Sequence, residues 1–321
     1  MSMSINTPAG VLCAGNVVFD MLVHPVDRLT WGATTWVETI GQSMGGNGAN
    51  TSYALARLGT PVRLIAVVGD DNYGDEMLSG LHSAGVDTSA ITRAWGASAT
   101  TISLVRSDGN RLFLHKPGVN LHALPEPIEF TARLLRGVTH FHLANPFGLP
   151  AFRAHAAETL RRAKAAGLRT SLDAAWDSQG RWLEDLGPCL PYVDLLFVNE
   201  EEAQMLTGLS DAIEAARRLH ELGAKTVVVK LGSRGCMHYS GGEPSFTKAF
   251  PVEVVDTTGA GDCFAGGFIA ALQRGLPLEG AARFANAVGA LSVRRVGSVA
   301  GLLSWEETEE WMAMAEQRLQ P

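Results

Sequence analysis

Residues 256–262 combine the residue types that phosphoryl transfer needs. The segment reads Asp-Thr-Thr-Gly-Ala-Gly-Asp, follows a strand-like Val-Val pair and leads into an alanine-rich helical pattern. A glycine-rich turn before a helix directs free N–H groups and the helix dipole toward one point, which suits a phosphate. A carboxylate beside an anion is costly unless it accepts a proton, so Asp262 is the candidate base for an attacking hydroxyl. The alternative is that Asp262 only caps the helix.

The elements that must position this turn alternate along the chain. Apolar, β-branched runs bounded by Gly or Asp predict buried strands, and the alanine-rich segments between them have helical periodicity. The expected strands are 11–18, 62–68, 138–143, 169–172, 193–198 and 226–231, and the expected helices are 49–58, 72–84, 151–166, 211–222 and 262–274. Strands that are apolar on both faces and alternate with helices predict an α/β fold with a mostly parallel sheet covered on both sides.

Two segments interrupt this alternation. Residues 100–105 and 111–115 are strand-like and are joined by Ser-Asp-Gly-Asn, a strong hairpin signal, while residues 21–42 lack helical periodicity. We expect these pieces, about 21–42 and 98–118, to form a small β-sheet lid over the active site of a single domain spanning residues 1–321. The alternative is an ordinary surface hairpin and a loop.

Composition argues against several classes of protein. Of the 321 residues, 46% are hydrophobic and 18% are charged, and the formal net charge of −7 does not favour nucleic-acid binding. The four cysteines form no Cys-x-x-Cys pair, so neither structural zinc nor a disulfide framework is expected. Because the sequence has no signal-peptide pattern and no run of about 18 apolar residues, we expect a cytoplasmic protein without a membrane segment.

A second glycine-rich motif accompanies the first. Residues 45–50 read Gly-Gly-Asn-Gly-Ala-Asn, and residues 54–59 read Ala-Leu-Ala-Arg-Leu-Gly. Together with the 256–262 turn, and in this order, they resemble the two signatures of the PfkB/ribokinase family of carbohydrate kinases. The resemblance covers essentially the whole chain. It implies a ribokinase-like three-layer αβα fold and Mg²⁺- and ATP-dependent phosphorylation of a hydroxyl on a small carbohydrate.

The resemblance also implies roles for particular residues. Asp262 would be the catalytic base, and the amides of Gly259, Ala260 and Gly261 would form the anion hole. The residues implied on the acceptor side are Asn16, Asp20, Gly45, Gly46 and Asn50, and those on the nucleotide side are Asn199, Lys230, Gly232, Ser233, Gly235 and Asn286. A polar residue within an apolar helix, such as Asn286, can equally be a satisfied core side chain.

Two cation sites and a dimer are implied in the same way. Glu202, in the run Asn-Glu-Glu-Glu that begins at Asn199, would help to hold Mg²⁺ through water, which fits an ion that keeps most of its waters. The alternative for these glutamates is a solvated first turn of a helix. Asp256 and Thr258 match part of a site for a monovalent cation such as K⁺, with residues 293–298 supplying the rest. In many relatives the lid forms a dimer contact, so we expect a homodimer.

The sequence departs from ribokinases at two acceptor-side positions. Asn47 stands where they typically have Lys, and Asn145 lies where they place a carboxylate, so ribose is not favoured as the substrate. A nucleoside kinase of the same family is the nearest alternative, with Trp31, Trp36 or Phe147 available to stack on a base. A sugar or nucleotide sensor without catalysis is the alternative from another class. No dinucleotide-binding Gly-x-Gly-x-x-Gly follows the first strand, and no P-loop motif occurs.

Overall fold

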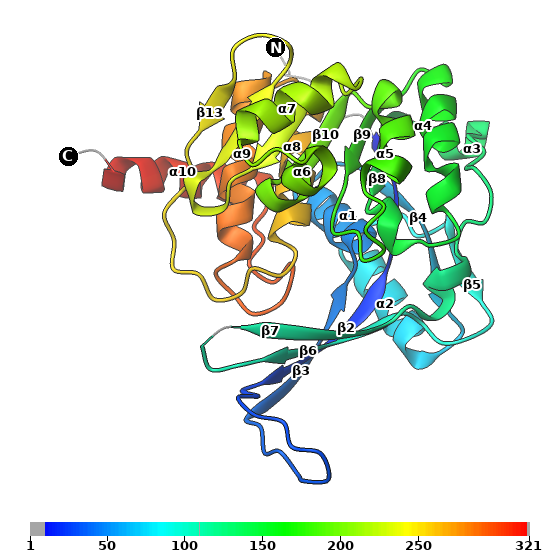
Figure 1. Cartoon of the computed structure of the whole chain (residues 1–321), viewed down its shortest axis with the longest axis vertical. Coiled ribbons are helices and arrows are strands. Elements are labelled where there is room, and N and C mark those ends of the chain that lie inside the picture. The colour runs from blue at the N-terminus through cyan, green and yellow to red at the C-terminus, as the bar shows by residue number, and fades with distance from the viewer. Residues whose placement is uncertain (1–9, 109, 320–321) are drawn as a thin grey trace, which may run out of the picture.

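The main sheet forms the centre of the molecule. The computed structural model describes residues 10–108 and 110–319, and within them this sheet has nine strands in the order β13-β12-β11-β10-β9-β8-β1-β4-β5 (Figure 1). The strands are β1 (Gly10–Gly15), β4 (Val62–Gly69), β5 (Ile91–Ala94), β8 (Val138–Ala144), β9 (Arg169–Asp173), β10 (Leu195–Asn199), β11 (Val227–Lys230), β12 (Cys236–Tyr239) and β13 (Ser245–Thr247). In this spatial order, the seven strands from β11 through β5 pair in parallel. Strand β12 is antiparallel to β11, and β13 is antiparallel to β12.

Helices cover both faces of this sheet. On one face lie α1 (Asn47–Arg57), α2 (Asn72–Ser83), α8 (Ala260–Gln273), α9 (Leu278–Ser292) and α10 (Trp305–Leu319). On the other lie α3 (Ala132–Leu135), α4 (Ala156–Ala165), α5 (Leu183–Leu186), α6 (Glu200–Thr207) and α7 (Ala212–Glu221). Short 3-10 turns occupy η1 (Gly118–His122), η2 (Pro146–Gly148), η3 (Arg153–His155), η4 (Gly187–Tyr192) and η5 (Gly232–Arg234). The predicted α/β class with a three-layer arrangement is confirmed.

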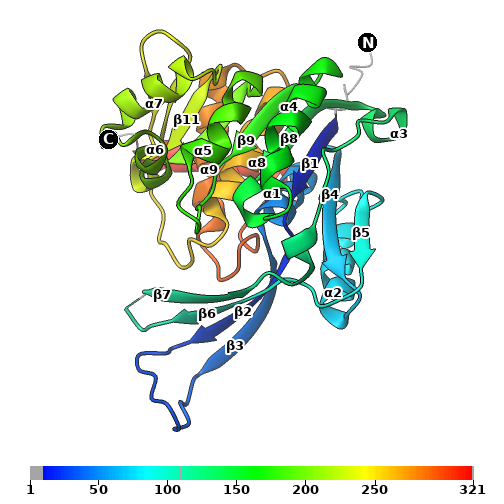
Figure 2. The same cartoon turned by 45° about the vertical axis from the view of Figure 1, so that its right-hand side comes forward.

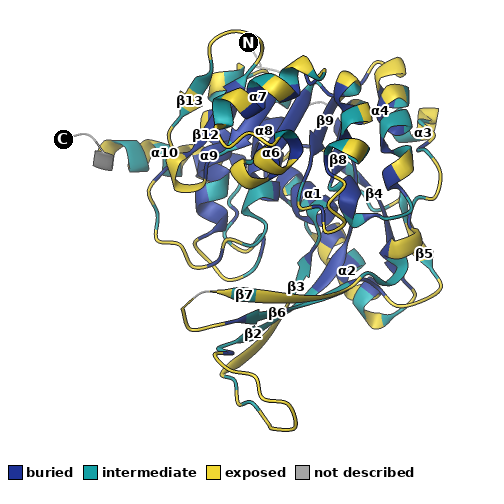
Figure 3. Ribbon diagram, viewed as in Figure 1, coloured by how far each residue is buried: buried dark blue, intermediate teal, exposed yellow. Residues whose placement is uncertain are grey.

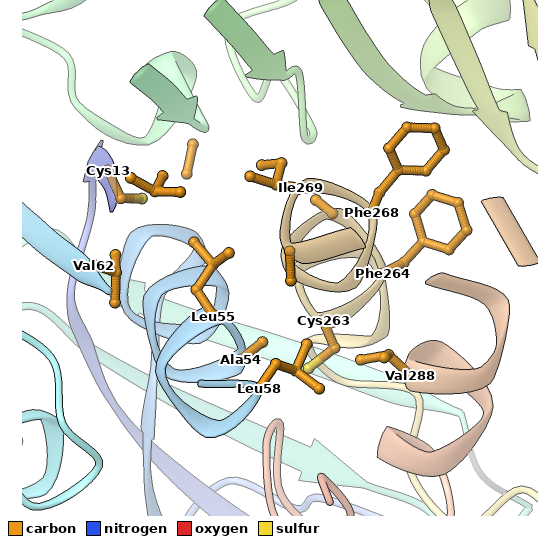
Figure 4. Close-up of a cluster of buried hydrophobic side chains, with 14 of the residues drawn as sticks. Cys13, Ala54, Leu55, Leu58, Val62, Cys263, Phe264, Phe268, Ile269 and Val288 are labelled. Carbon is orange, nitrogen blue, oxygen red and sulfur yellow. The ribbon is translucent and has the colours of Figure 1, made fainter. Parts of the chain in front are cut away.

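Two core helices approach each other closely because small residues line their contact. Figure 4 shows Ala54 and Leu55 of α1 facing α8, which contributes Cys263 and Phe268 to the same buried cluster. A Cβ atom added to Gly266 of α8 would lie only 2.8 Å from the Cβ of Ala54. This close packing sets the first turn of α1 beside the first turn of α8.

A small sheet projects from the main body (Figures 1 and 2). Its strand order is β3-β2-β6-β7, and its strands are β2 (Val18–His24), β3 (Thr39–Gly45), β6 (Thr100–Val105) and β7 (Arg111–Lys116). The pairs β2–β3 and β6–β7 are antiparallel, whereas β2–β6 is parallel. Figure 3 shows that much of this sheet and the loop between β2 and β3 are exposed.

Three predicted elements are wrong in extent. The expected strand 11–18 divides between the two sheets, because β1 ends at Gly15, whose backbone lies against Gly48, and β2 begins at Val18. The expected helix 151–166 starts only at Ala156, after the separate turn η3. The Val-Val pair at 254–255 is not a strand, since it is exposed and its backbone bonds to the carbonyl of Val293 instead of to a strand.

No α-helix within residues 10–108 and 110–319 has the length and apolar character needed to cross a membrane.

Candidate active site

Three neighbouring parallel strands end on polar residues, so these residues lie along one side of the main sheet, at the carboxyl ends of its strands. Asp173 ends β9, Asn199 ends β10 and Lys230 ends β11, and their registers bring these ends together. Lys230 Nζ lies 3.0 Å from both carboxylate oxygens of Asp173. A Cβ atom on Gly261 would lie 3.1 Å from Lys230 Nζ, so the first turn of α8 reaches the same side of the sheet. This side therefore joins a buried ion pair to the glycine-rich turn.

Asp262 lies at the centre of this region and is only 6% exposed. Its Oδ1 accepts a hydrogen bond from Asn47 Nδ2 and its Oδ2 accepts one from Asn50 Nδ2, each at 2.8 Å. The N-cap of α8 is Gly259, and Asp262 is the third residue of the helix. The alternative in which Asp262 is an N-cap is therefore wrong.

Burial raises the pKa of Asp262 to about 6, and the nearby charge of Asp173 adds to this rise. The two asparagine donors and the Lys230 charge oppose it, because they favour the ionised carboxylate. Burial alone would lower the pKa of Lys230, but the charges of Asp173 and Glu202 outweigh burial and raise it to about 12. The lysine is therefore a fixed positive charge beside a carboxylate with unusual basicity.

The turn before α8 requires glycine at the N-cap position of that helix. Gly259 has a φ of 72° and a ψ of 1°, a left-handed conformation, and an added Cβ would lie 2.6 Å from the Cβ of Ser298. The turn is fixed by hydrogen bonds from Ala260 N to Thr257 O and from Thr258 N to Asp256 Oδ1. A helix start of this kind presents backbone N–H groups to an anion.

The expected acceptor-side residues surround the junction between β3 and α1. Asp20 packs so closely on Gly45 that an added Cβ there would lie 1.9 Å from Asp20 Oδ2. Asn16 Oδ1 accepts the backbone N–H of Asn47 at 3.0 Å, and Gly46 has a φ of 92°. Burial, together with the charges of Asp262 and Asp256, raises the pKa of Asp20 to about 7. Asp20, Asn16, Gly45 and Gly46 are thus brought to the same place as the Asp262 carboxylate.

The nucleotide-side residues fall into two groups. Asn199 and Glu202 form a capping box for α6, in which Asn199 Oδ1 accepts the N–H of Glu202 and Glu202 Oε2 accepts the N–H of Asn199. Burial raises the pKa of Glu202. Gly232 and Ser233 lie exposed in η5, which is separated from Lys230 by Leu231 alone, and Gly235 follows with a φ of 100°. No cluster of three or more metal-ligating side chains occurs among the described residues.

Asn286 makes contacts that agree with the core alternative. Its Nδ2 donates to the carbonyls of Thr247 and Lys248, at 3.0 and 3.2 Å. Gly235 approaches the same segment, since an added Cβ would lie 2.0 Å from Thr247 O. Asn286 therefore fixes a backbone segment next to the turn that follows β11.

Several residues at this site were missed by sequence reasoning. In the sequence, Asn47 and Asn145 stand out only as departures from ribokinases. In the structure, Asn145 Nδ2 donates to Asn47 Oδ1 at 2.7 Å and so extends the chain of amides from Asp262. The Asp173–Lys230 pair was not predicted, although polar residues at the carboxyl ends of neighbouring parallel strands were a usable signal. Arg111, which pairs with Asp256, gave no sequence signal at all.

The fold and the site together define a ribokinase-like kinase. The chain matches the model of the pfkB family carbohydrate kinases over residues 9–305, and it belongs to that family. It is thus an ATP-dependent kinase of sugars or nucleosides, as predicted.

Individual relatives and solved structures agree with this assignment. An ATP-dependent ribose-1-phosphate kinase of Halopiger xanaduensis is 36% identical over 292 residues, covering 90% of this chain and 93% of the relative. An Arabidopsis thaliana ribokinase solved with ribose and ATP has a TM-score of 0.83 and 26% identity, covering 95% of this chain and 99% of that one. A putative ribokinase II from E. coli, solved with ATP and Mg²⁺, has a TM-score of 0.82, 26% identity and the same two coverages.

Proposed function

We propose that the chain transfers the γ-phosphoryl group of ATP to a primary or anomeric hydroxyl of a small sugar or polyol, with Asp262 as the general base. The acceptor hydroxyl gives its proton to the Asp262 carboxylate while its oxygen bonds to the γ-phosphorus. The bond from that phosphorus to the β–γ bridging oxygen breaks, and ADP leaves with the electron pair. The amides of Gly259, Ala260 and Gly261 stabilise the charge on the migrating group.

The setting of the Asp262 carboxylate carries this proposal. It is buried in the first turn of α8, and Asn47 and Asn50 each donate to one of its oxygens. A pKa of about 6 leaves it ionised at neutral pH and still basic enough to accept a proton.

We propose the remaining roles from the match of these residues to the motifs of the family. The residues that would bind the acceptor are Asn16, Asp20, Gly45, Gly46 and Asn50. Those that would lie along the nucleotide are Asn199, Lys230, Gly232, Ser233 and Gly235. Asn286 would support them indirectly, by holding the backbone of Thr247 and Lys248. Glu202 would hold Mg²⁺ through water, which suits a carboxylate whose capping box uses only Oε2. When bound, Mg²⁺ would neutralise phosphate charge.

The small sheet would act as the lid and as the homodimer contact. It carries Asp20 and Gly45, so its closure would bring the acceptor-side residues over the base and exclude water. Exposed apolar side chains on β3 and β7, including Ile40 and Phe113, provide a surface for a second copy. Light scattering of the native chain and of Phe113→Glu tests this contact, and a native monomer would contradict it.

An acceptor panel tests the reaction. ADP formation is measured with Mg²⁺, ATP and ribose, fructose, ribose 1-phosphate, 2-keto-3-deoxygluconate, inositol or adenosine. Asp262→Asn should lower kcat by roughly 100-fold or more with nucleotide affinity nearly unchanged. The exposed Asp70 provides the matched control, Asp70→Asn. Near-normal turnover by Asp262→Asn would contradict the assignment of the base.

The same panel separates the alternatives. A strong preference for adenosine would indicate a nucleoside kinase. Of the aromatic residues that could stack on its base, Trp31 and Trp36 are almost fully exposed, and Phe147 already packs on Trp182. Sugar binding by titration calorimetry without any ADP formation would indicate a sensor.

A further inference from the structure

The cation site expected at Asp256 does not match the residues that surround it. Arg111, from β7 of the small sheet, places its NH2 group 2.9 Å from Asp256 Oδ1. Its NH1 group donates to the Thr258 hydroxyl. The Asp256 side chain is 3% exposed and that of Arg111 is 19% exposed. A guanidinium therefore stands beside the carboxylate that was expected to contribute to binding a monovalent ion.

Asp256 also organises the turn of the anion hole. Its Oδ1 accepts the N–H of Thr258 and its Oδ2 accepts the N–H of Gly297, both at 2.9 Å. Although burial alone would raise the pKa of Asp256, these hydrogen bonds and the Arg111 charge lower it below its usual value. The carboxylate thus fixes the start of the 256–262 turn to the segment that contains Gly297 and Ser298.

Arg111 already supplies the positive charge that the buried Asp256 carboxylate needs. Both of its oxygens accept hydrogen bonds, and a K⁺ ion beside Oδ1 would meet the like charge of the guanidinium. Among the ion pairs of residues 10–108 and 110–319, Arg111 is the only partner of Asp256. Arg294 and Arg295, which lie in the segment expected to complete the cation site, are exposed.

We propose that Arg111 replaces the monovalent cation, so that phosphoryl transfer by this chain does not depend on K⁺. Arg111 is then a positioning residue, which acts on the anion-hole turn through Asp256 and Thr258. Because it belongs to the small sheet, its charge reaches the turn only while that sheet lies over the site. This inference rests on the proposed kinase reaction.

The test compares salts that share an anion but differ in cation. With K⁺, Na⁺ or tetramethylammonium as the only monovalent cation, the native enzyme should keep its kcat within about twofold. Arg111→Ala in tetramethylammonium should lose roughly tenfold or more, and K⁺ should restore most of that loss. Arg111→Lys should retain activity without K⁺. Arg106→Ala is the matched control, because Arg106 is exposed and pairs with Asp108 in the same hairpin.

Thermal melting separates this inference from the kinase proposal. K⁺ should raise the Tm of Arg111→Ala more than that of the native chain, and this result does not require turnover. Activation of the native enzyme by K⁺ of about tenfold would overturn the inference. Equal behaviour of Arg111→Ala and the native chain, or a loss that K⁺ does not restore, would overturn it as well. Absence of turnover with every acceptor would instead contradict the proposed function.

Discussion

Asn47 donates its side-chain amide to Oδ1 of Asp262 over 2.8 Å, joining residues that lie 215 positions apart in the sequence. The contact ties the first turn of α1 to the first turn of α8. Because a donor to a carboxylate favours its ionised form, α1 helps to set the pKa of Asp262 in α8.

The pH dependence of the reaction should follow the ionisation of Asp262. Its pKa is raised to about 6, so the ionised base is lost as pH falls through that value. The kcat at saturating acceptor should fall roughly tenfold between pH 7 and about pH 5. The negative charge of bound ATP would shift this limb to higher pH. Assays from about pH 5 to 9 measure it. A rate that stays flat down to about pH 5, as a group with the ordinary aspartate pKa of 3.8 would give, would contradict this prediction.

Removing one amide donor should move the same limb. In the native chain, the hydrogen bond from Asn50 to Oδ2 lowers the pKa of Asp262. Asn50→Ala removes that hydrogen bond, so the pKa of Asp262 should rise and the acidic limb should shift to higher pH. The variant should therefore lose more activity near pH 6 than near pH 8, where the base is ionised in both proteins. A loss that is equal at every pH would assign Asn50 to substrate binding alone.

The Asp173–Lys230 pair should show strong coupling in stability. Lys230→Met leaves the buried carboxylates of Asp173 and Glu202 without their cation, which should cost about 3–5 kcal/mol. Adding Asp173→Asn should recover part of this loss. Urea unfolding of the two single variants and the double variant measures the coupling free energy. Simple additivity would show that the pair is not an energetic unit.

Gly45 should be required for acceptor affinity. A side chain at this position would collide with Asp20, so Gly45→Ala should raise the KM for the acceptor by roughly tenfold while leaving the KM for ATP nearly unchanged. Gly41→Ala is the matched control in the same strand, because an added Cβ there meets nothing within 4 Å. Similar kinetics for the two variants would argue against Asp20 as a binding residue.

Glu202 should determine the Mg²⁺ requirement. Glu202→Gln keeps an oxygen for the capping box but removes the charge, so half-maximal activity should need several-fold more Mg²⁺. Glu201→Gln is the control, since Glu201 lies in the same helical turn and is exposed. Mg²⁺ titrations of initial rate at fixed ATP compare them. Equal requirements would restrict Glu202 to its capping role.

The parts of the site that were predictable are those whose chemistry is local in sequence. The 256–262 turn contains both the proposed base and the proposed anion-hole amides, and the alternation of buried strands with helices was sufficient to predict the α/β class. By contrast, the bond from Asn47 to Asp262 depends on the packing of α1 against α8, which no periodicity specifies. The contact of Arg111 with Asp256 could not be predicted for the same reason, because it depends on where the small sheet lies relative to the 256–262 turn.

The junction at Gly46 has a mechanical consequence. This single residue separates the end of β3 from the start of α1. A displacement of the strand that holds Gly45 against Asp20 would therefore also displace the helix whose Asn47 and Asn50 donate to Asp262. Any swing of the small sheet would be transmitted to both amide donors of Asp262. Proton transfer to Asp262 would then require a bound molecule large enough to hold the small sheet in place. A single water molecule could not do this, so hydrolysis of ATP would be slow.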